Sequence, residues 1–202
     1  MTAVTSLAAL GNVTLEPKDL ALLAMLDRRS GGPPHWRLRK RVEATDLLRL
    51  AAVSSVARCL ELDLDDELRA VMHLEVPVAV GTEERVEIHL GVVVALRYPA
   101  MSLVPGCGVQ PQVAVLRPTG VFHPNVVPMP PQVLCLGALP PGVRVVELCW
   151  MTWRALAMQD RQVDELDPAG VLHAGAARYW QTRIGCLPLT RRSLFARAEE
   201  AS

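Results

Sequence analysis

The sequence carries no excess charge, no long apolar run and no basic N-terminal leader, and each absence excludes a class of protein. Its 21 acidic and 21 basic residues give a formal net charge of zero, which provides no electrostatic footprint for nucleic acid or an anionic membrane. No uninterrupted apolar stretch approaches the ~20 residues that a membrane-spanning helix requires. Met1–Leu15 lacks the basic residues and apolar core of a secretory signal. We therefore expect a cytoplasmic protein that binds neither nucleic acid nor membrane.

Cysteine is sparse and unpaired in the sequence. The 5 cysteines are scattered, and no two of them form a Cys-x-x-Cys pair: Cys59, Cys107, Cys135, Cys149 and Cys186. An odd number of scattered cysteines indicates free thiols in a reducing compartment rather than a disulfide framework. His123, Cys135 and Cys107 could suggest zinc, but their spacing does not match that of paired zinc ligands. We therefore expect no bound metal.

Lysine is even rarer, because it occurs only at Lys18 and Lys40 while arginine supplies the remaining basic residues. An enzyme that handles activated acyl groups would gain from having few acceptor amines of its own. GC-rich codon usage in a bacterial genome is the simpler explanation of the same composition.

The first third of the chain predicts two helices separated by a break. Glu16-Pro17 begins a helix that ends near Asp27, with proline in the first turn where its missing N–H is tolerated. The Gly/Pro cluster at 30–34 interrupts the chain. A second helix is expected over 36–53. We therefore divide the chain into an N-terminal helical extension, residues 1–35, and a main domain, residues 36–202.

Four segments then show the alternation that is typical of half-buried strands. They cover residues 57–64, 68–80, 86–96 and 112–116, and Gly81-Thr82-Glu83 is a plausible hairpin turn between the second and third. One apolar and one polar face on each long strand favours an antiparallel sheet with helices packed on one side. The predicted fold class is α+β, with a four-stranded antiparallel meander.

The remainder of the chain predicts a proline-stiffened loop followed by helices. Prolines crowd residues 124–141, and because they lack backbone donors we expect a rigid loop that cannot join the sheet. Apolar residues then recur at helical spacing over 143–158 and place Trp150 and Trp153 on one face against the core. A last helical region begins near Asp167-Pro168.

The most informative stretch is His123-Pro124-Asn125, followed ten positions later by Cys135. A thiolate can accept an acyl group as a thioester, and an amide N–H can stabilise the oxyanion that forms when the thioester is attacked. Each residue also has an ordinary explanation. A free cysteine is commonly a small buried apolar residue, and asparagine beside proline often satisfies a turn. His123 is a candidate general base, with a usual pKa near neutrality.

The same stretch resembles the central part of the ubiquitin-conjugating (E2) family. The shared motifs, in order along about residues 68–160, are Tyr98-Pro99, Pro105, Pro111-Gln112-Val113, Val121-Phe122-His123-Pro124-Asn125-Val126 and Leu134-Cys135-Leu136-Gly137. The resemblance implies a UBC-like fold in which Cys135 is the catalytic thiol. It implies that Asn125 supports the catalytic loop or the oxyanion, and that His123 and Pro124 are structural members of the motif.

The resemblance also implies partners. Cys135 would receive a ubiquitin-like protein from an E1-like activating enzyme and pass it to a protein target, and ATP would be used by the activating partner, so no cofactor is expected here. Family members usually carry an acid after Cys-Leu, whereas Gly137 and Ala138 stand there in this chain. The Cys-Leu-Gly variant looks more like bacterial E2-like proteins of ubiquitin-like conjugation operons, some of which serve antiphage defence.

Some points stay open at this stage. The acid that would act on the attacking amine has only rough candidates by position, namely Asp160, Asp164 and Asp167. Two other functions compete with the carrier. One is a catalytically inactive E2 variant that only binds or scaffolds, although such variants generally lack the cysteine. The other is a small cysteine hydrolase with a His123/Cys135 dyad, which requires the imidazole within hydrogen-bond reach of the sulfur.

Overall fold

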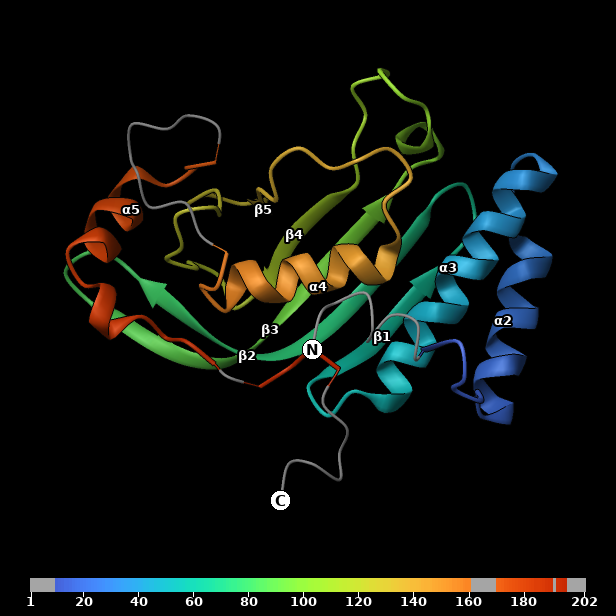
Figure 1. Ribbon diagram of the computed structural model, residues 1–202, viewed down its shortest axis with the longest axis horizontal. Helices are drawn as coiled ribbons and strands as arrows, with labels where there is room; N and C mark the ends of the chain where they lie inside the picture. Colours follow the sequence, from blue (N-terminus) through green and yellow to red (C-terminus); the bar gives the residue numbers. More distant parts are fainter. Residues whose placement is uncertain (1–9, 161–169, 191, 196–202) are drawn as a thin grey trace.

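The computed structural model describes residues 10–160, 170–190 and 192–195, which form one antiparallel sheet with its covering helices (Figure 1). The elements are α2 (Pro17–Arg29), α3 (Pro34–Val53), β1 (Ala57–Asp63), β2 (Leu68–Gly81), β3 (Val86–Tyr98), η1 (Ala100–Leu103), β4 (Gln112–Arg117), β5 (Gln132–Leu134), α4 (Val145–Leu156), α5 (Ala174–Gln181) and η2 (Ile184–Cys186). The predicted α+β class and antiparallel meander are confirmed. None of the described helices is long and apolar enough to cross a membrane.

The sheet follows from the period-two pattern of its long strands. The strand order is β1-β2-β3-β4-β5, and every neighbouring pair is antiparallel. The alternate residues of β2 that face the helices are buried: Leu68, Ala70, Met72, Leu74, Val76 and Val78. The turn between β2 and β3 is closed by the Thr82 N–H, which donates to the Arg85 carbonyl at 3.0 Å. Gly81 precedes it with a φ of 125°, a conformation that strongly favours glycine.

The expectation that the proline-rich segment cannot join the sheet, and with it the count of four strands, is wrong. Gln132–Leu134 forms the fifth strand and pairs with Val113–Val115 of β4. The prolines limit this strand without preventing it, because they stand before residue 132 and after residue 139 and leave the intervening backbone donors intact. The strand ends immediately before Cys135.

The helices cover one face of the sheet, as predicted. In Figure 1, α4 lies across the front of the sheet and α3 lies beside β1, while α2 packs on the outer side of α3. Trp153 is buried in the core under α4. Trp150 is only partly buried, and the Arg154 guanidinium stacks 4.7 Å from the centre of its ring. Both tryptophans lie on α4, but only Trp153 is as deeply buried as the helical spacing predicted.

Residues from the N-terminal extension contribute to the same core. Leu23 and Leu26 of α2 are buried in the main hydrophobic cluster. The Gly/Pro break is also tied to the domain, because the fully buried Lys40 of α3 donates to the carbonyl oxygens of Gly31, Leu64 and Asp65. Burial lowers the pKa of this ammonium group. The described part of the extension thus packs on the sheet-and-helix unit.

A second, smaller cluster forms at the end of the sheet beneath α5. Phe122 and Trp180 are its large members, and the Trp180 indole Nε1–H donates to the Phe122 carbonyl at 3.1 Å. The Phe122 N–H in turn donates to the Ala79 carbonyl of β2 at 2.8 Å. These contacts fix the backbone directly before His123.

Candidate active site

A short antiparallel pairing brings Asn125 opposite Cys135. The Cys135 N–H donates to the Asn125 carbonyl at 2.8 Å, and the Val127 N–H donates to the Val133 carbonyl at 2.9 Å. Between them, Val126 and Leu134 form a β-bridge. Directly opposed residues in such a pair have Cα atoms about 4.5–5.5 Å apart. The ten-residue spacing in the sequence thus becomes a direct cross-strand contact.

Cys135 is half-buried at the point where the chain leaves β5. The following Leu136 packs against the main core, and Gly137 adopts a φ of 76°, which turns the chain away from the sheet. The thiol is therefore held on one side by the strand and on the other by an anchored side chain. It is free of any disulfide.

The other cysteines differ from Cys135 in their surroundings. Cys149 is fully buried, and burial raises the pKa of its thiol well above the ordinary range. Burial also raises the pKa of Cys59 to about 11. Cys107 donates its S–H to the Met101 carbonyl at 2.7 Å, and Cys186 is exposed in η2. Because the thiolate is the nucleophile, the raised pKa values make Cys59 and Cys149 poor candidates.

His123 is buried, and both of its ring nitrogens meet the backbone. Nδ1 accepts the Asn125 N–H at 3.0 Å, so this nitrogen carries no proton. Nε2 then carries the proton and donates to the Ala155 carbonyl of α4 at 2.8 Å. The imidazole therefore joins the motif to the end of α4, and its two nitrogens are occupied rather than directed at an incoming group.

The Asn125 side chain is buried against the segment that precedes α5. Its Nδ2 donates to the Gly170 carbonyl at 2.8 Å. The same segment binds the neighbouring Pro124, whose carbonyl accepts the N–H groups of Leu172 and His173 at 2.8 and 3.0 Å. We call residues 170–173 the clasp. It holds the Pro124 backbone and the Asn125 amide at once.

His173 connects the clasp to α5. As the N-cap residue, its Nδ1 accepts the Ala176 N–H at 3.2 Å, and its ring meets Phe122 edge-on at 5.1 Å between centres. Burial lowers the pKa of the imidazole. Sequence reasoning missed this residue, because histidine is an uncommon N-cap and nothing in its neighbours marks it.

Gln132 is a second residue that sequence reasoning missed. Its side chain is buried, and its Oε1 accepts the N–H of Gly120 at 2.9 Å and that of Val121 at 3.4 Å. Gly120 and Val121 lead into the His-Pro-Asn motif, whereas Gln132 leads into Cys135. One amide side chain therefore ties together the two segments that carry the site. A polar residue inside a proline-rich stretch gives no sequence signal for this contact.

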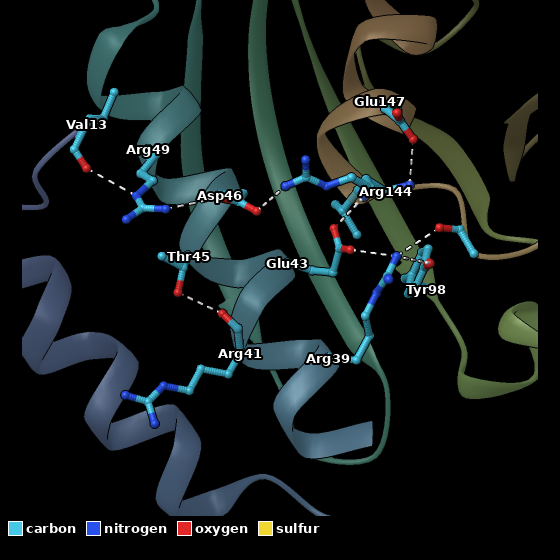
Figure 2. Close-up of polar contacts among 12 residues, drawn as sticks. Val13, Arg39, Arg41, Glu43, Thr45, Asp46, Arg49, Tyr98, Arg144 and Glu147 are labelled. Carbon is cyan, nitrogen blue, oxygen red and sulfur yellow. Dashed lines mark hydrogen bonds and ion pairs between the residues drawn. The ribbon is translucent and has the colours of Figure 1, made fainter. Parts of the chain in front are cut away.

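The loop between Cys135 and α4 is anchored at its far end by α3 and β3 (Figure 2). The Tyr98 hydroxyl donates to the Val143 carbonyl at 2.6 Å, and the Arg39 guanidinium donates to the Gly142 carbonyl at 2.9 Å. Tyr98 belongs to the Tyr-Pro motif, so this motif meets the loop that follows the cysteine. Burial raises the pKa of the Tyr98 hydroxyl.

Two acids of α3 then hold the start of α4. The buried Glu43 accepts the Val145 N–H at 2.7 Å and pairs with Arg39 at 2.8 Å. Asp46 pairs with Arg144, the residue directly before α4 (Figure 2). Burial raises the pKa of Glu43, whereas the Val145 N–H and Arg39 oppose the rise. Glu43 supplies an acceptor to a helix N-terminus, where a carboxylate is favourable.

The acid expected near the thiol is not assigned. Asp160 forms an ion pair with Arg154, whose Nε lies 2.5 Å from its Oδ2. Asp164 and Asp167 lie outside the described residues. Within the described ranges, no group of three or more His, Cys, Asp and Glu side chains could hold a metal ion.

The fold and the site define an α+β protein in which the backbone of a half-buried cysteine pairs with that of a buried asparagine. Comparison with models of protein families, with curated proteins and with solved structures finds no match to this chain.

Proposed function

We propose that the protein is an E2-like carrier of a ubiquitin-like protein, with a UBC-like fold. The Cys135 thiolate attacks the thioester held by an E1-like enzyme, a new S–C bond forms, and the thiolate of the E1-like enzyme departs. A target amine then attacks the Cys135 thioester, an amide forms and the Cys135 thiolate is released. We place the reaction in the bacterial cytoplasm, in a ubiquitin-like conjugation system of the antiphage type.

The observation that carries this proposal is the cross-strand pairing of Cys135 with Asn125. The pairing fixes the backbone of the half-buried Cys135 to the backbone of Asn125, so a thiol and a residue with an amide side chain lie on neighbouring segments. An amide donor close to the thiol is what stabilisation of the oxyanion in thioester transfer would use. The order of elements supports it as well. Helix α3, the meander, the His-Pro-Asn motif, Cys135 and α4 follow one another as the resemblance implies.

In the first alternative, the protein has the same fold but only binds or scaffolds a ubiquitin-like protein or an E1-like partner, without catalysis. A fully buried thiol would favour it, and Cys135 is instead half-buried. The hydrolase alternative is disfavoured by His123, whose two ring nitrogens bond to the Asn125 N–H and to the Ala155 carbonyl. A general base needs a nitrogen that can take the proton of the nucleophile.

Incubation with an E1-like partner, a ubiquitin-like protein and ATP tests the proposal on non-reducing gels. The wild-type protein should give an adduct that thiols remove, and Cys135→Ala should give none. Cys135→Ser should give a thiol-resistant oxyester. Cys107→Ser is the matched control, since this cysteine is equally half-buried but lies in another loop, and its adduct should equal that of the wild type.

Two outcomes would contradict the carrier. One is an adduct that persists in Cys135→Ala. The other is the absence of any adduct with an E1-like partner that demonstrably forms its own thioester. A thiol-sensitive adduct that is lost in Cys107→Ser would show that Cys107, rather than the Cys135 that pairs with Asn125, is the acceptor thiol.

A further inference from the structure

The first half of β3 is an open sheet edge. Residues Val86–Leu90 pair with β2 on one side only, and β4 joins the other side of β3 from Val93 onward. In the described chain, no backbone hydrogen bond reaches Val86–Leu90 from beyond the β2 ladder. Alternate residues of such a strand direct their N–H and C=O groups outward, and these groups can pair with another strand.

The side chains on this edge are unusually apolar for a surface strand. Leu90 is 88% exposed and Ile88 is 50% exposed, although both alternate with charged or polar residues. Proteins commonly protect an edge with lysine, proline or a bulge. β3 has none of these between Val86 and Leu90. Its register with β2 is regular over these five residues and shifts only beyond Leu90.

The outer edge of β1, by contrast, is interrupted. The register of β1 against β2 shifts between Cys59 and Glu61, so Leu60 is an extra residue at a bulge. A bulge twists an edge and disfavours pairing with another strand. The two edges therefore differ in their capacity to pair, and β3 is the one suited to it.

The sequence of the β3 edge is complementary to itself in the antiparallel direction. With a two-fold axis at Ile88, each Ile88 lies opposite the other, and Val86 lies opposite Leu90. The same register places Glu87 opposite His89, a carboxylate facing an imidazole that can donate an N–H. Moving the register by one residue would place Glu87 opposite Leu90. Apolar pairs and opposite-charge pairs on one face stabilise a sheet, whereas mixed pairs do not.

We propose that this edge binds the same edge of a second copy of the chain. The two five-stranded sheets then join across Val86–Leu90 with Ile88 on the two-fold axis. A second copy is the occupant because the order of apolar residues, hydrogen-bond acceptor and hydrogen-bond donor from Val86 to Leu90 is matched by its own reversal, which an unrelated peptide would have no reason to share. An edge pair of this kind closes after two copies.

The first test is sedimentation velocity at roughly 100 µM, a concentration at which even weakly associating dimers are populated. The wild-type protein should be a dimer, and Ile88→Lys should raise the dissociation constant at least about tenfold because two ammonium groups meet at the axis. Leu60→Lys is the matched control, since Leu60 is 54% exposed on the β1 edge. It should leave the dimer intact, and both variants should keep the wild-type circular dichroism and melting temperature.

Cysteine cross-linking tests the register. Glu87→Cys mixed with His89→Cys should form a disulfide-linked dimer, because opposed residues have Cα atoms within the range a disulfide spans. Neither variant alone, nor the parent protein, should cross-link to that extent. A monomeric wild type, an assembly larger than a dimer, dissociation by Leu60→Lys, or equal cross-linking in all samples would overturn the proposal.

Discussion

Residues at the candidate site hold neighbouring backbone in place. Asn125 does so twice, because its side-chain amide donates to the Gly170 carbonyl while its backbone carbonyl accepts the Cys135 N–H. The identity of the pair could be predicted from the sequence, since a thiol and an amide stood in one short segment. The Gly170 contact could not, because it joins residues 45 positions apart across a loop of no marked pattern.

Replacement of Asn125 by alanine should slow discharge of the thioester to an amine more than it slows loading. Loss of one oxyanion donor typically lowers such a rate by about 10²–10³-fold. Single-turnover loading and discharge, measured separately, give the two rates. Gln132→Ala is the matched control, because Gln132 also bonds to nearby backbone but carries no proposed chemistry. Equal slowing of both steps by Asn125→Ala would assign the residue a folding role alone.

The stability of the protein should fall as the pH drops below about 6.5 because of His173. Burial lowers the pKa of His173 below its usual 6.5, so the unfolded chain binds a proton more readily than the folded one. The stabilising contribution is present above pH 6.5 and is lost as the pH falls through the lowered pKa. Protonation also removes the Nδ1 acceptor that caps α5.

His173→Asn is the corresponding test, because asparagine also accepts a hydrogen bond at an N-cap but does not titrate. Between pH 7 and pH 5.5, the melting temperature of the wild type should fall further than that of the variant. An identical fall in both proteins would contradict the assignment.

At the scale of elements, β1 to β4 were predictable from the sequence and the three-residue β5 was not. Period-two alternation over β2 and β3 gave both their ends to within two residues. β5 spans only three residues between prolines, too few for a period to be visible. The Gly/Pro break before α3 was likewise evident as a local signal. The attachment of this break to the domain through Lys40 was not evident, because the sequence does not show whether a lysine side chain is buried or exposed.

β5 depends on the Gln132 side chain, which joins it to the Gly120–Val121 segment that leads into the His-Pro-Asn motif. Gln132→Ala would leave the N–H groups of Gly120 and of the buried Val121 without their acceptor. An unsatisfied buried donor typically costs ~1–3 kcal/mol, so unfolding in urea should show a loss of that size. Hydrogen exchange at Gly120 and Val121 should accelerate in the same variant. Unchanged exchange at both amides would show that the contact does not hold this segment.

The start of α4 depends on Glu43 in a comparable way. Glu43→Ala would remove the acceptor of the Val145 N–H and leave Arg39 without its carboxylate partner. Breaking a buried charge pair from one side typically costs ~3–5 kcal/mol, and the partial exposure of Arg39 places this case at the lower end. Chemical denaturation should show the loss.

Glu43→Gln is the companion variant, because it keeps an acceptor for the helix and should lose less stability than Glu43→Ala. In both variants, the rate at which Cys135 is loaded should fall only as far as the fraction of folded protein falls. A Gln variant as unstable as the Ala variant would indicate that the charge, rather than the cap on Val145, is what the fold needs.

At the scale of the whole molecule, the site is assembled from distant parts of the chain. The sheet supplies Cys135, the clasp before α5 holds Asn125, and the end of α4 holds His123. The loop after Cys135 is fixed from α3 through Arg39 and Glu43. The short segments that carry Cys135 and Asn125 are therefore held from several elements of a much larger scaffold.

The most direct measurement is the intact mass of the protein after incubation with an E1-like enzyme, a ubiquitin-like protein and ATP. The account predicts a mass increase equal to the ubiquitin-like protein less one water, located on Cys135 and removed by a small thiol. Cys135→Ala should show no increase. An increase of the same mass in Cys135→Ala, or an adduct that the thiol does not remove from the wild type, would contradict the central claim that Cys135 carries the acyl group.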